Sequence, residues 1–86
     1  MIVKLFTKPN CQKCFPAKNM CTSLESDGIA VKRYDVETVD GMAEAALYEA
    51  ELTPTVIIVD DKDDEVKSWR GAAPKKEEVL AALKPA

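Results

Sequence analysis

Lys8-Pro9-Asn10-Cys11-Gln12-Lys13-Cys14 is the stretch around which the rest of the chain is organised, because it places two cysteines, separated by two residues, between a short apolar run and a segment with helical spacing. A thiolate is the nucleophile of disulfide exchange, and the backbone N–H groups at a helix N-terminus stabilise negative charge. The spacing lets the second thiol reach back to the first and close an intramolecular disulfide. The stretch therefore predicts a dithiol redox centre, although metal knuckles share the same spacing.

Length and composition predict one small domain, covering residues 1–86, with a compact core. Three cysteines in a chain that is 47% hydrophobic do not form the even and dense set of a secreted disulfide framework. The N-terminus has no signal-peptide pattern, and no stretch approaches the roughly 20 apolar residues that a membrane span requires. We therefore expect a cytoplasmic monomer that does not insert into membranes.

Charge is unevenly distributed along the chain. The formal net charge is −3, but the first 24 residues contain only basic charges, namely Lys4, Lys8, Lys13 and Lys18. Positive surroundings lower the pKa of a cysteine and attract acidic partner surfaces. Solvated lysines on a soluble domain are the plainer interpretation. The overall acidity of the chain argues against nucleic-acid binding.

The pattern of apolar residues predicts seven elements in the order β-α-β-α-β-β-α. Strands are expected at residues 2–6, 29–36, 56–59 and 65–69, and helices at residues 12–26, at residues 41–51 and after Pro74. Residues 56–59 are a continuous β-branched run, which is typical of a strand covered on both faces. The first half forms a parallel unit with a right-handed crossover, and the second half adds an antiparallel hairpin and a closing helix. The predicted fold class is α/β, with a four-stranded mixed sheet flanked by three helices.

Some helix boundaries can also be predicted. Pro16 lacks the N–H that an interior helical position needs, so a helix over residues 12–26 should have a distorted first turn or a later start. Gly28 fits its end, Asp40 is the candidate N-cap of the second helix, and Pro74 fits the first turn of the third. The side chains expected to face the core are Ala43, Ala46, Leu47 and Ala50 in the second helix and Val79, Leu80 and Leu83 in the third.

Three features together resemble the thioredoxin superfamily over nearly the whole chain. These are the dithiol between the first strand and the first helix, Thr53-Pro54 before the apolar third strand, and the order of the elements. Within the superfamily the chain looks most like the small glutaredoxin-like redoxins of the NrdH type. The strings that carry this likeness are residues 5–14 (LFTKPNCQKC) and residues 68–71 (SWRG).

The resemblance implies a thioredoxin-like fold and a thiol–disulfide oxidoreductase that carries electrons to protein disulfides. Cys11 would be the attacking thiolate, and Cys14 would resolve the mixed disulfide. Thr53 would offer backbone hydrogen bonds to an extended substrate segment, and Pro54 would be a cis-proline that holds this loop against the thiols. Lys8 matches the basic residue that glutaredoxins place beside the active site.

The resemblance also implies partners. The dithiol is itself the redox group, so we expect no other cofactor, and ribonucleotide reductase is the substrate that the NrdH likeness suggests. Glutathione-binding glutaredoxins usually end the fourth strand in Gly-Gly and carry an Asp that grips the tripeptide, whereas residues 69–74 read WRGAAP. We therefore expect a thioredoxin-reductase-type electron donor. A glutathione-dependent glutaredoxin and a metal or iron–sulfur carrier are the alternatives.

Two further positions, Leu5 and Cys21, bear on the redox chemistry. Thioredoxin itself carries an acidic residue six positions before the first cysteine, but Leu5 occupies that position here, so the sequence identifies no proton acceptor for Cys14. Cys21 lies two helical turns after Cys14, and we expect a buried structural thiol, since free cysteine packs as a small hydrophobe. A third redox or metal thiol is the alternative, although a zinc site needs four Cys or His ligands and this chain has three Cys and no His.

Overall fold

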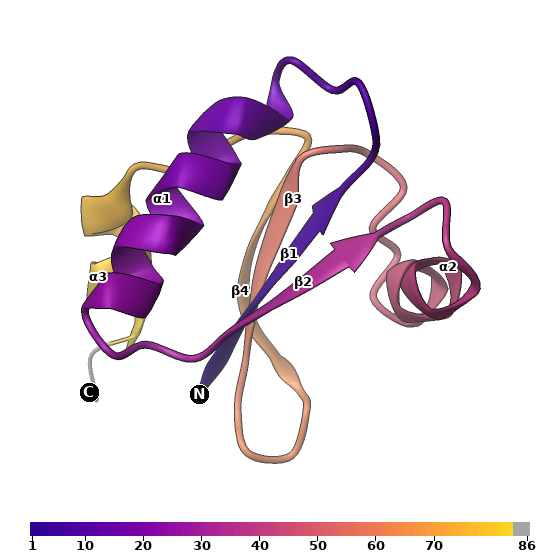
Figure 1. The fold of residues 1–86 in the computed structure, drawn as a ribbon. Coiled ribbons are helices and arrows are strands. Elements are labelled where there is room, and N and C mark those ends of the chain that lie inside the picture. Colours follow the sequence, from indigo (N-terminus) through magenta and orange to yellow (C-terminus); the bar gives the residue numbers. More distant parts are fainter. Residues whose placement is uncertain (84–86) are drawn as a thin grey trace.

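A four-stranded mixed sheet separates two helical layers in the computed structural model, which describes residues 1–83 (Figure 1). The elements are β1 (Ile2–Thr7), α1 (Cys14–Ser26), β2 (Val31–Asp35), α2 (Val39–Leu47), β3 (Thr55–Val59), β4 (Glu65–Arg70) and α3 (Lys76–Leu83). The strand order is β2-β1-β3-β4, with β1 parallel to β2 and the other two pairings antiparallel. Helices α1 and α3 cover one face of the sheet and α2 covers the other (Figure 1). The predicted fold class and element order are confirmed.

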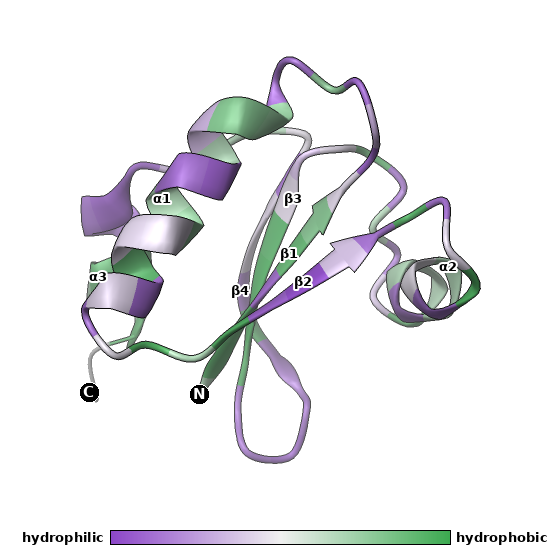
Figure 2. Cartoon of the chain, in the orientation of Figure 1, coloured by the Kyte–Doolittle hydropathy of each residue, from purple (hydrophilic) through white to green (hydrophobic). Residues whose placement is uncertain are grey.

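The strand alternation divides the apolar residues between two cores, one on each face of the sheet. Val3 and Leu5 belong to the core under α1 and α3, whereas Phe6 belongs to the core under α2. All five residues of β3 are buried, as the β-branched run predicts. Figure 2 shows that apolar residues predominate along β1 and β3, whereas the β3–β4 hairpin loop is hydrophilic.

Lys4 is buried on the α2 face of β1, although it is charged. Its Nζ donates hydrogen bonds to Glu44 Oε2 at 2.9 Å and to Tyr48 Oη at 3.3 Å. Burial opposes the charged form of Lys4, but the two hydrogen bonds outweigh it, so the pKa of Lys4 is raised above its ordinary value. Lys4 therefore anchors α2 to the sheet and does not add to the exposed positive charge near the dithiol, contrary to the interpretation from the sequence.

Helix α2 begins earlier than predicted. Its N-cap is Thr38, whose hydroxyl accepts a hydrogen bond from the Gly41 N–H at 3.0 Å, so Asp40 lies in the first turn and is not the cap. A Cβ atom at Gly41 would overlap the backbone carbonyl of Asp35. The glycine therefore lets the helix approach the end of β2 closely.

The buried face of α2 also differs from the predicted one. Ala43, Ala46 and Leu47, which the apolar pattern predicts to be buried, are exposed. Ala50 is buried as expected, but it lies beyond the helix. The residues that face the sheet recur at helical spacings of three or four positions in α2 and at the position just after it. They are Gly41, Glu44, Ala45 and Tyr48.

Helix α3 starts at Lys76. Pro74 was predicted to lie in the first turn of this helix, but it is buried two residues before the helix begins. Val79 is buried, and Leu80 and Leu83 pack against the same core, as expected. Among the helices within residues 1–83, none combines the length and the apolar character that crossing a membrane requires.

Candidate active site

The two cysteines of the C-x-x-C stretch lie at one end of the sheet, where β1 leads into α1 (Figure 1). Cys11 and Cys14 form a disulfide, with their Cα atoms 5.3 Å apart. Cys11 is partly exposed in the connecting loop, whereas Cys14 is the first residue of α1 and is fully buried. Only Cys11 can therefore be reached directly by a macromolecular partner.

A tight turn carries the chain from this loop into α1. Asn10 adopts a positive φ of 59°, a left-handed conformation that asparagine tolerates better than most residues. The N–H of Cys14 then donates to the carbonyl of Cys11 at 3.1 Å. The helix starts at Cys14 and not at residue 12, so Pro16 falls in its first turn, where the missing N–H has no partner to lose. The expectation of a later start is confirmed.

The loop before β3 faces the dithiol. The Thr53–Pro54 peptide bond is cis, as the resemblance implies, and Pro54 is buried. Thr53 Oγ1 lies 3.9 Å from Cys11 Sγ. Because a sulfur in a disulfide carries no hydrogen, the Thr53 hydroxyl is the donor in this weak contact. The structure thus brings together four of the five site residues predicted from the sequence, and the fifth, Lys8, is exposed in the turn after β1.

Thr55 is a further residue that shapes the site and that the sequence analysis missed. It is fully buried, and its hydroxyl donates to the backbone carbonyl of Leu52. This hydrogen bond fixes the bend of the loop that presents Thr53. The only signal in the sequence is a hydroxyl side chain at the start of a strand whose other residues are all aliphatic.

Apolar and basic side chains surround Cys11 on the α1 side. Phe15 is 62% exposed, and Lys18 Nζ lies 5.7 Å from the centre of its ring. Lys8 and Lys13 are also exposed. A hollow of about 320 Å³ beside the dithiol is lined by Asn10, Cys11, Gln12, Phe15 and Lys18.

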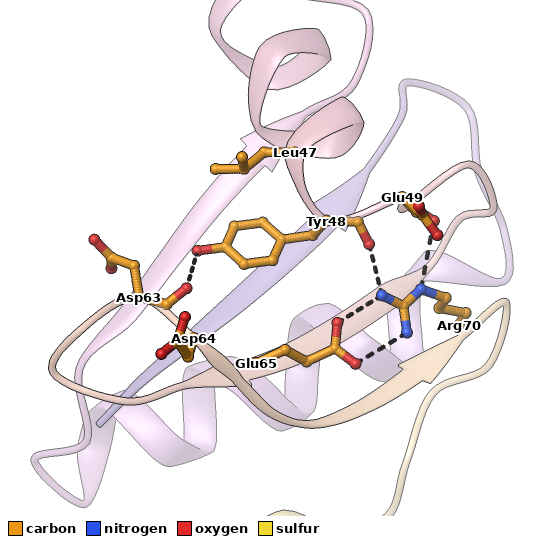
Figure 3. A pocket seen from close by; sticks show the side chains of 7 residues that line it. All are labelled: Leu47, Tyr48, Glu49, Asp63, Asp64, Glu65 and Arg70. Atoms are coloured by element: carbon orange, nitrogen blue, oxygen red, sulfur yellow. Dashed lines mark hydrogen bonds and ion pairs between the residues drawn. The ribbon is translucent and has the colours of Figure 1, made fainter.

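A larger hollow, of about 470 Å³, lies between the end of α2 and the β3–β4 hairpin (Figure 3). Arg70 crosses it, and its guanidinium donates to the backbone carbonyls of Tyr48 and Glu49. The same guanidinium donates to both carboxylate oxygens of Glu65, and this bond lowers the pKa of Glu65. Arg70 is therefore a structural link between β4 and α2, with its donors already bound by the protein.

Cys21 is buried in the core between α1 and the sheet. Burial raises the pKa of its thiol to about 11, so it is neutral and inaccessible under ordinary conditions. The prediction of a buried thiol is confirmed. Within residues 1–83, the Cys, Asp and Glu side chains form no group of three or more that could hold a metal ion.

The strand order, the dithiol at the start of α1 and the cis-proline before β3 define a thioredoxin-like domain. A family model described as a thioredoxin domain matches residues 1–84, so the chain belongs to the thioredoxin domain family. The predicted superfamily is thereby confirmed, whereas the likeness to NrdH-type redoxins stays a prediction. A comparison with curated proteins gives no significant match.

Solved structures agree on the fold. Thioredoxin 1 from Thermosipho africanus is 23% identical, with a TM-score of 0.75, over 96% of this chain and 90% of that chain. The thioredoxin Deadhead from Drosophila melanogaster is 20% identical, with a TM-score of 0.75, over 96% of this chain and 80% of that chain. An uncharacterised thioredoxin-like protein from Clostridium perfringens is 18% identical, with a TM-score of 0.79, over 95% of this chain and 67% of that chain. At these identities the likeness shows that the fold is thioredoxin-like.

Proposed function

We propose that this protein is a thiol–disulfide oxidoreductase that reduces the disulfides of partner proteins. The observation that carries the proposal is the arrangement of its two cysteines. Cys11 is open to a partner, Cys14 is buried within disulfide-bonding distance behind it, and the Thr53–Pro54 loop faces the pair.

The reaction takes two exchange steps. In the reduced protein, the thiolate of Cys11 attacks one sulfur of the partner's disulfide, and the partner's other sulfur leaves as a thiolate and takes up a proton. The thiol of Cys14 then loses its proton and attacks Cys11 Sγ, which closes the Cys11–Cys14 disulfide and releases the partner's second thiolate. The second thiolate also takes up a proton, so two electrons pass from the protein to its partner, while one proton is released by Cys14 and the other is supplied by the solvent.

Three features support the first step. The N-terminus of α1 directs the positive end of the helix dipole toward the cysteines, which favours a thiolate. Lys18, which lines the same hollow as Cys11, adds positive charge that also favours the thiolate, and the Thr53 hydroxyl is placed to donate to the charged sulfur. We assign Thr53 and Pro54 to the binding of an extended segment of the partner.

For the electron source we favour a thioredoxin-reductase-type enzyme over glutathione. Residues 71–75 contain no acidic side chain for the amino group of glutathione, and the guanidinium of Arg70 beside them is already bound to Glu65. The proposed protein is a cytoplasmic monomeric carrier with no cofactor beyond its dithiol. Ribonucleotide reductase is the substrate to examine first, given the NrdH likeness.

A coupled assay tests the proposal. Oxidised protein is mixed with insulin as the disulfide substrate and NADPH, together with either thioredoxin reductase or glutathione and glutathione reductase. We expect NADPH consumption and insulin reduction with thioredoxin reductase, loss of both in Cys11→Ser, and retention of both in the matched control Cys21→Ala. Turnover with glutathione alone would assign the other electron donor. Failure of the chemically reduced protein to reduce insulin would overturn the function itself.

A further inference from the structure

Helix α1 carries its charges in the order opposite to the one that stabilises a helix. Lys13 is its N-cap, with no capping hydrogen bond from the side chain, and the first turn contains no acidic residue. Lys18 follows in the first half, whereas Glu25 and Asp27 lie at the C-terminal end. A basic charge at the N-terminal end of a helix is unfavourable, because it lies at the positive end of the helix dipole. Helix stability therefore does not explain these lysines.

Ion pairing does not explain them either. Among the residues that the structure describes, neither Lys13 nor Lys18 forms a salt bridge. The acidic residues at the other end of the helix are paired, Glu25 with Arg33 and Asp27 with Lys76. The positive charge at the dithiol end of α1 is thus left uncompensated, and no acidic residue occurs in the first 24 positions.

Two large apolar side chains are exposed on the two segments that flank the dithiol. Phe15 is 62% exposed in the first turn of α1, and Leu52 is 59% exposed in the loop that precedes Thr53. The hollow next to Cys11 is lined by the apolar side chain of Phe15 and the charged side chain of Lys18. The loop before β3, which faces the dithiol from the side opposite α1, carries an acidic residue, the exposed Glu51 next to Leu52. A partner approaching Cys11 therefore meets an apolar surface whose α1 side is positive.

We propose that Phe15 and Lys18, which line the hollow beside Cys11, together with the exposed N-cap Lys13, select partner proteins whose disulfide is flanked by acidic residues next to an apolar one. We term these three residues the α1 surface. This inference rests on the proposed function and names its substrate class. An apolar side chain of the partner covers Phe15, and its carboxylates approach the two ammonium groups. Attraction of this kind acts mainly on the rate of encounter and is screened by salt.

Three peptide disulfides of equal length test the inference. Each is a pair of identical peptides joined through a single cysteine, with leucine beside the cysteine and Asp, Gln or Lys at the flanking positions. The rate at which each one oxidises the reduced protein is measured at about 10 mM and about 1 M salt, where the Debye lengths are roughly 30 Å and 3 Å. We expect the Asp peptide to react about tenfold faster than the Lys peptide at low salt. The ratio of the two rates should approach one at high salt.

The double variant Lys13→Gln/Lys18→Gln should lose most of this ratio. The matched control Lys62→Gln/Lys67→Gln removes the same charge from the β3–β4 hairpin and should keep it. A change in the reactivity of the Cys11 thiolate would alter all three peptide rates alike, so the ratio reports on docking. Equal rates for the three peptides, or a ratio that survives in the α1 double variant, would overturn the inference and leave the proposed function standing. No reaction with any peptide would overturn the proposed function.

Discussion

The buried ion pair between Lys4 and Glu44 should respond unequally to the removal of its two members. The side chain of Lys4 is 5% exposed, whereas that of Glu44 is 28% exposed. Glu44→Ala therefore strands an ammonium group in the core, whereas Lys4→Met leaves a carboxylate that water can reach.

The size of the difference follows from the surroundings of each charge. Removing one partner from a buried ion pair costs about 3–5 kcal/mol, because the other charge is left uncompensated. In Glu44→Ala, the Tyr48 hydroxyl at 3.3 Å and the Tyr48 ring, whose centre is 4.6 Å from Lys4 Nζ, offset about 1 kcal/mol of this cost. We therefore expect this variant to lose about 2–4 kcal/mol. In Lys4→Met the new side chain fills a similar volume, so the loss should be about 1 kcal/mol, as for a partly exposed pair.

Urea denaturation followed by far-UV circular dichroism measures these losses in the wild type, the two single variants and the double variant. The double variant Lys4→Met/Glu44→Ala buries no charge and should be more stable than Glu44→Ala alone. In the wild type the pKa of Lys4 is raised above its ordinary value of 10.5. The ion pair therefore contributes fully to the free energy of unfolding below pH 10.5, and this contribution is lost as the pH rises through the raised pKa. In Glu44→Ala, burial without the carboxylate lowers this pKa, so that variant should gain stability as the pH rises toward 10.5.

Two results would refute this reasoning. One is a loss in Lys4→Met that equals or exceeds the loss in Glu44→Ala, because the exposed fractions of the two side chains would then not decide the cost. The other is a double variant whose loss is the sum of the two single losses, because the cost would then not arise from the stranded ammonium group.

Three further predictions concern the site. Cys14→Ser should trap a mixed disulfide with a protein substrate, visible on a non-reducing gel, whereas full dithiol turnover in this variant would contradict the roles assigned to Cys14 and Cys11. Cys21→Ala should keep its activity, and its free energy of unfolding, measured by urea denaturation, should fall by at most about 2–3 kcal/mol. In the wild type, labelling of Cys21 by iodoacetamide at about pH 8 would contradict a buried thiol with a pKa of about 11. Thr55→Val removes the hydrogen bond to Leu52, worth about 0.5–1.5 kcal/mol, and should slow the reduction of protein disulfides more than that of a small disulfide. Thr55→Ser should restore the rate, and equal slowing on both kinds of disulfide would show that Thr55 does not position the loop.

The parts of the fold that were predicted correctly depend on local patterns. The β-branched run of residues 56–59 predicts a strand covered on both faces, and β3 is buried along its whole length. The spacing of Cys11 and Cys14, followed by helical periodicity, indicates a dithiol at a helix start, and the helix begins at the second cysteine. Neither prediction requires knowledge of distant residues.

The buried face of α2 could not be predicted in this way. Its inward residues include a glycine, a charged residue and an alanine, and the exposed face is more apolar than the buried one. Glu44 points inward because its partner, Lys4, lies 40 positions earlier in the chain. Gly41 points inward because the carbonyl of Asp35 leaves no room for a side chain. The hydroxyl of Thr55 was missed for a similar reason, since its role depends on the bend of a loop that only the folded chain displays.

The pairing of β1 with β3 has a consequence for redesign of this protein. The dithiol follows β1 and the cis-proline loop precedes β3, and these strands are direct neighbours, with Phe6 opposite Thr55. The two loops of the site therefore emerge from strand ends that are one strand spacing, about 4.8 Å, apart. A slip of one residue would exchange the side chains of the two cores, so this spacing is protected by the whole apolar interior. The loop that holds Cys11 and the loop that holds Thr53 can therefore each be redesigned while the spacing of the strand ends that carry them is kept.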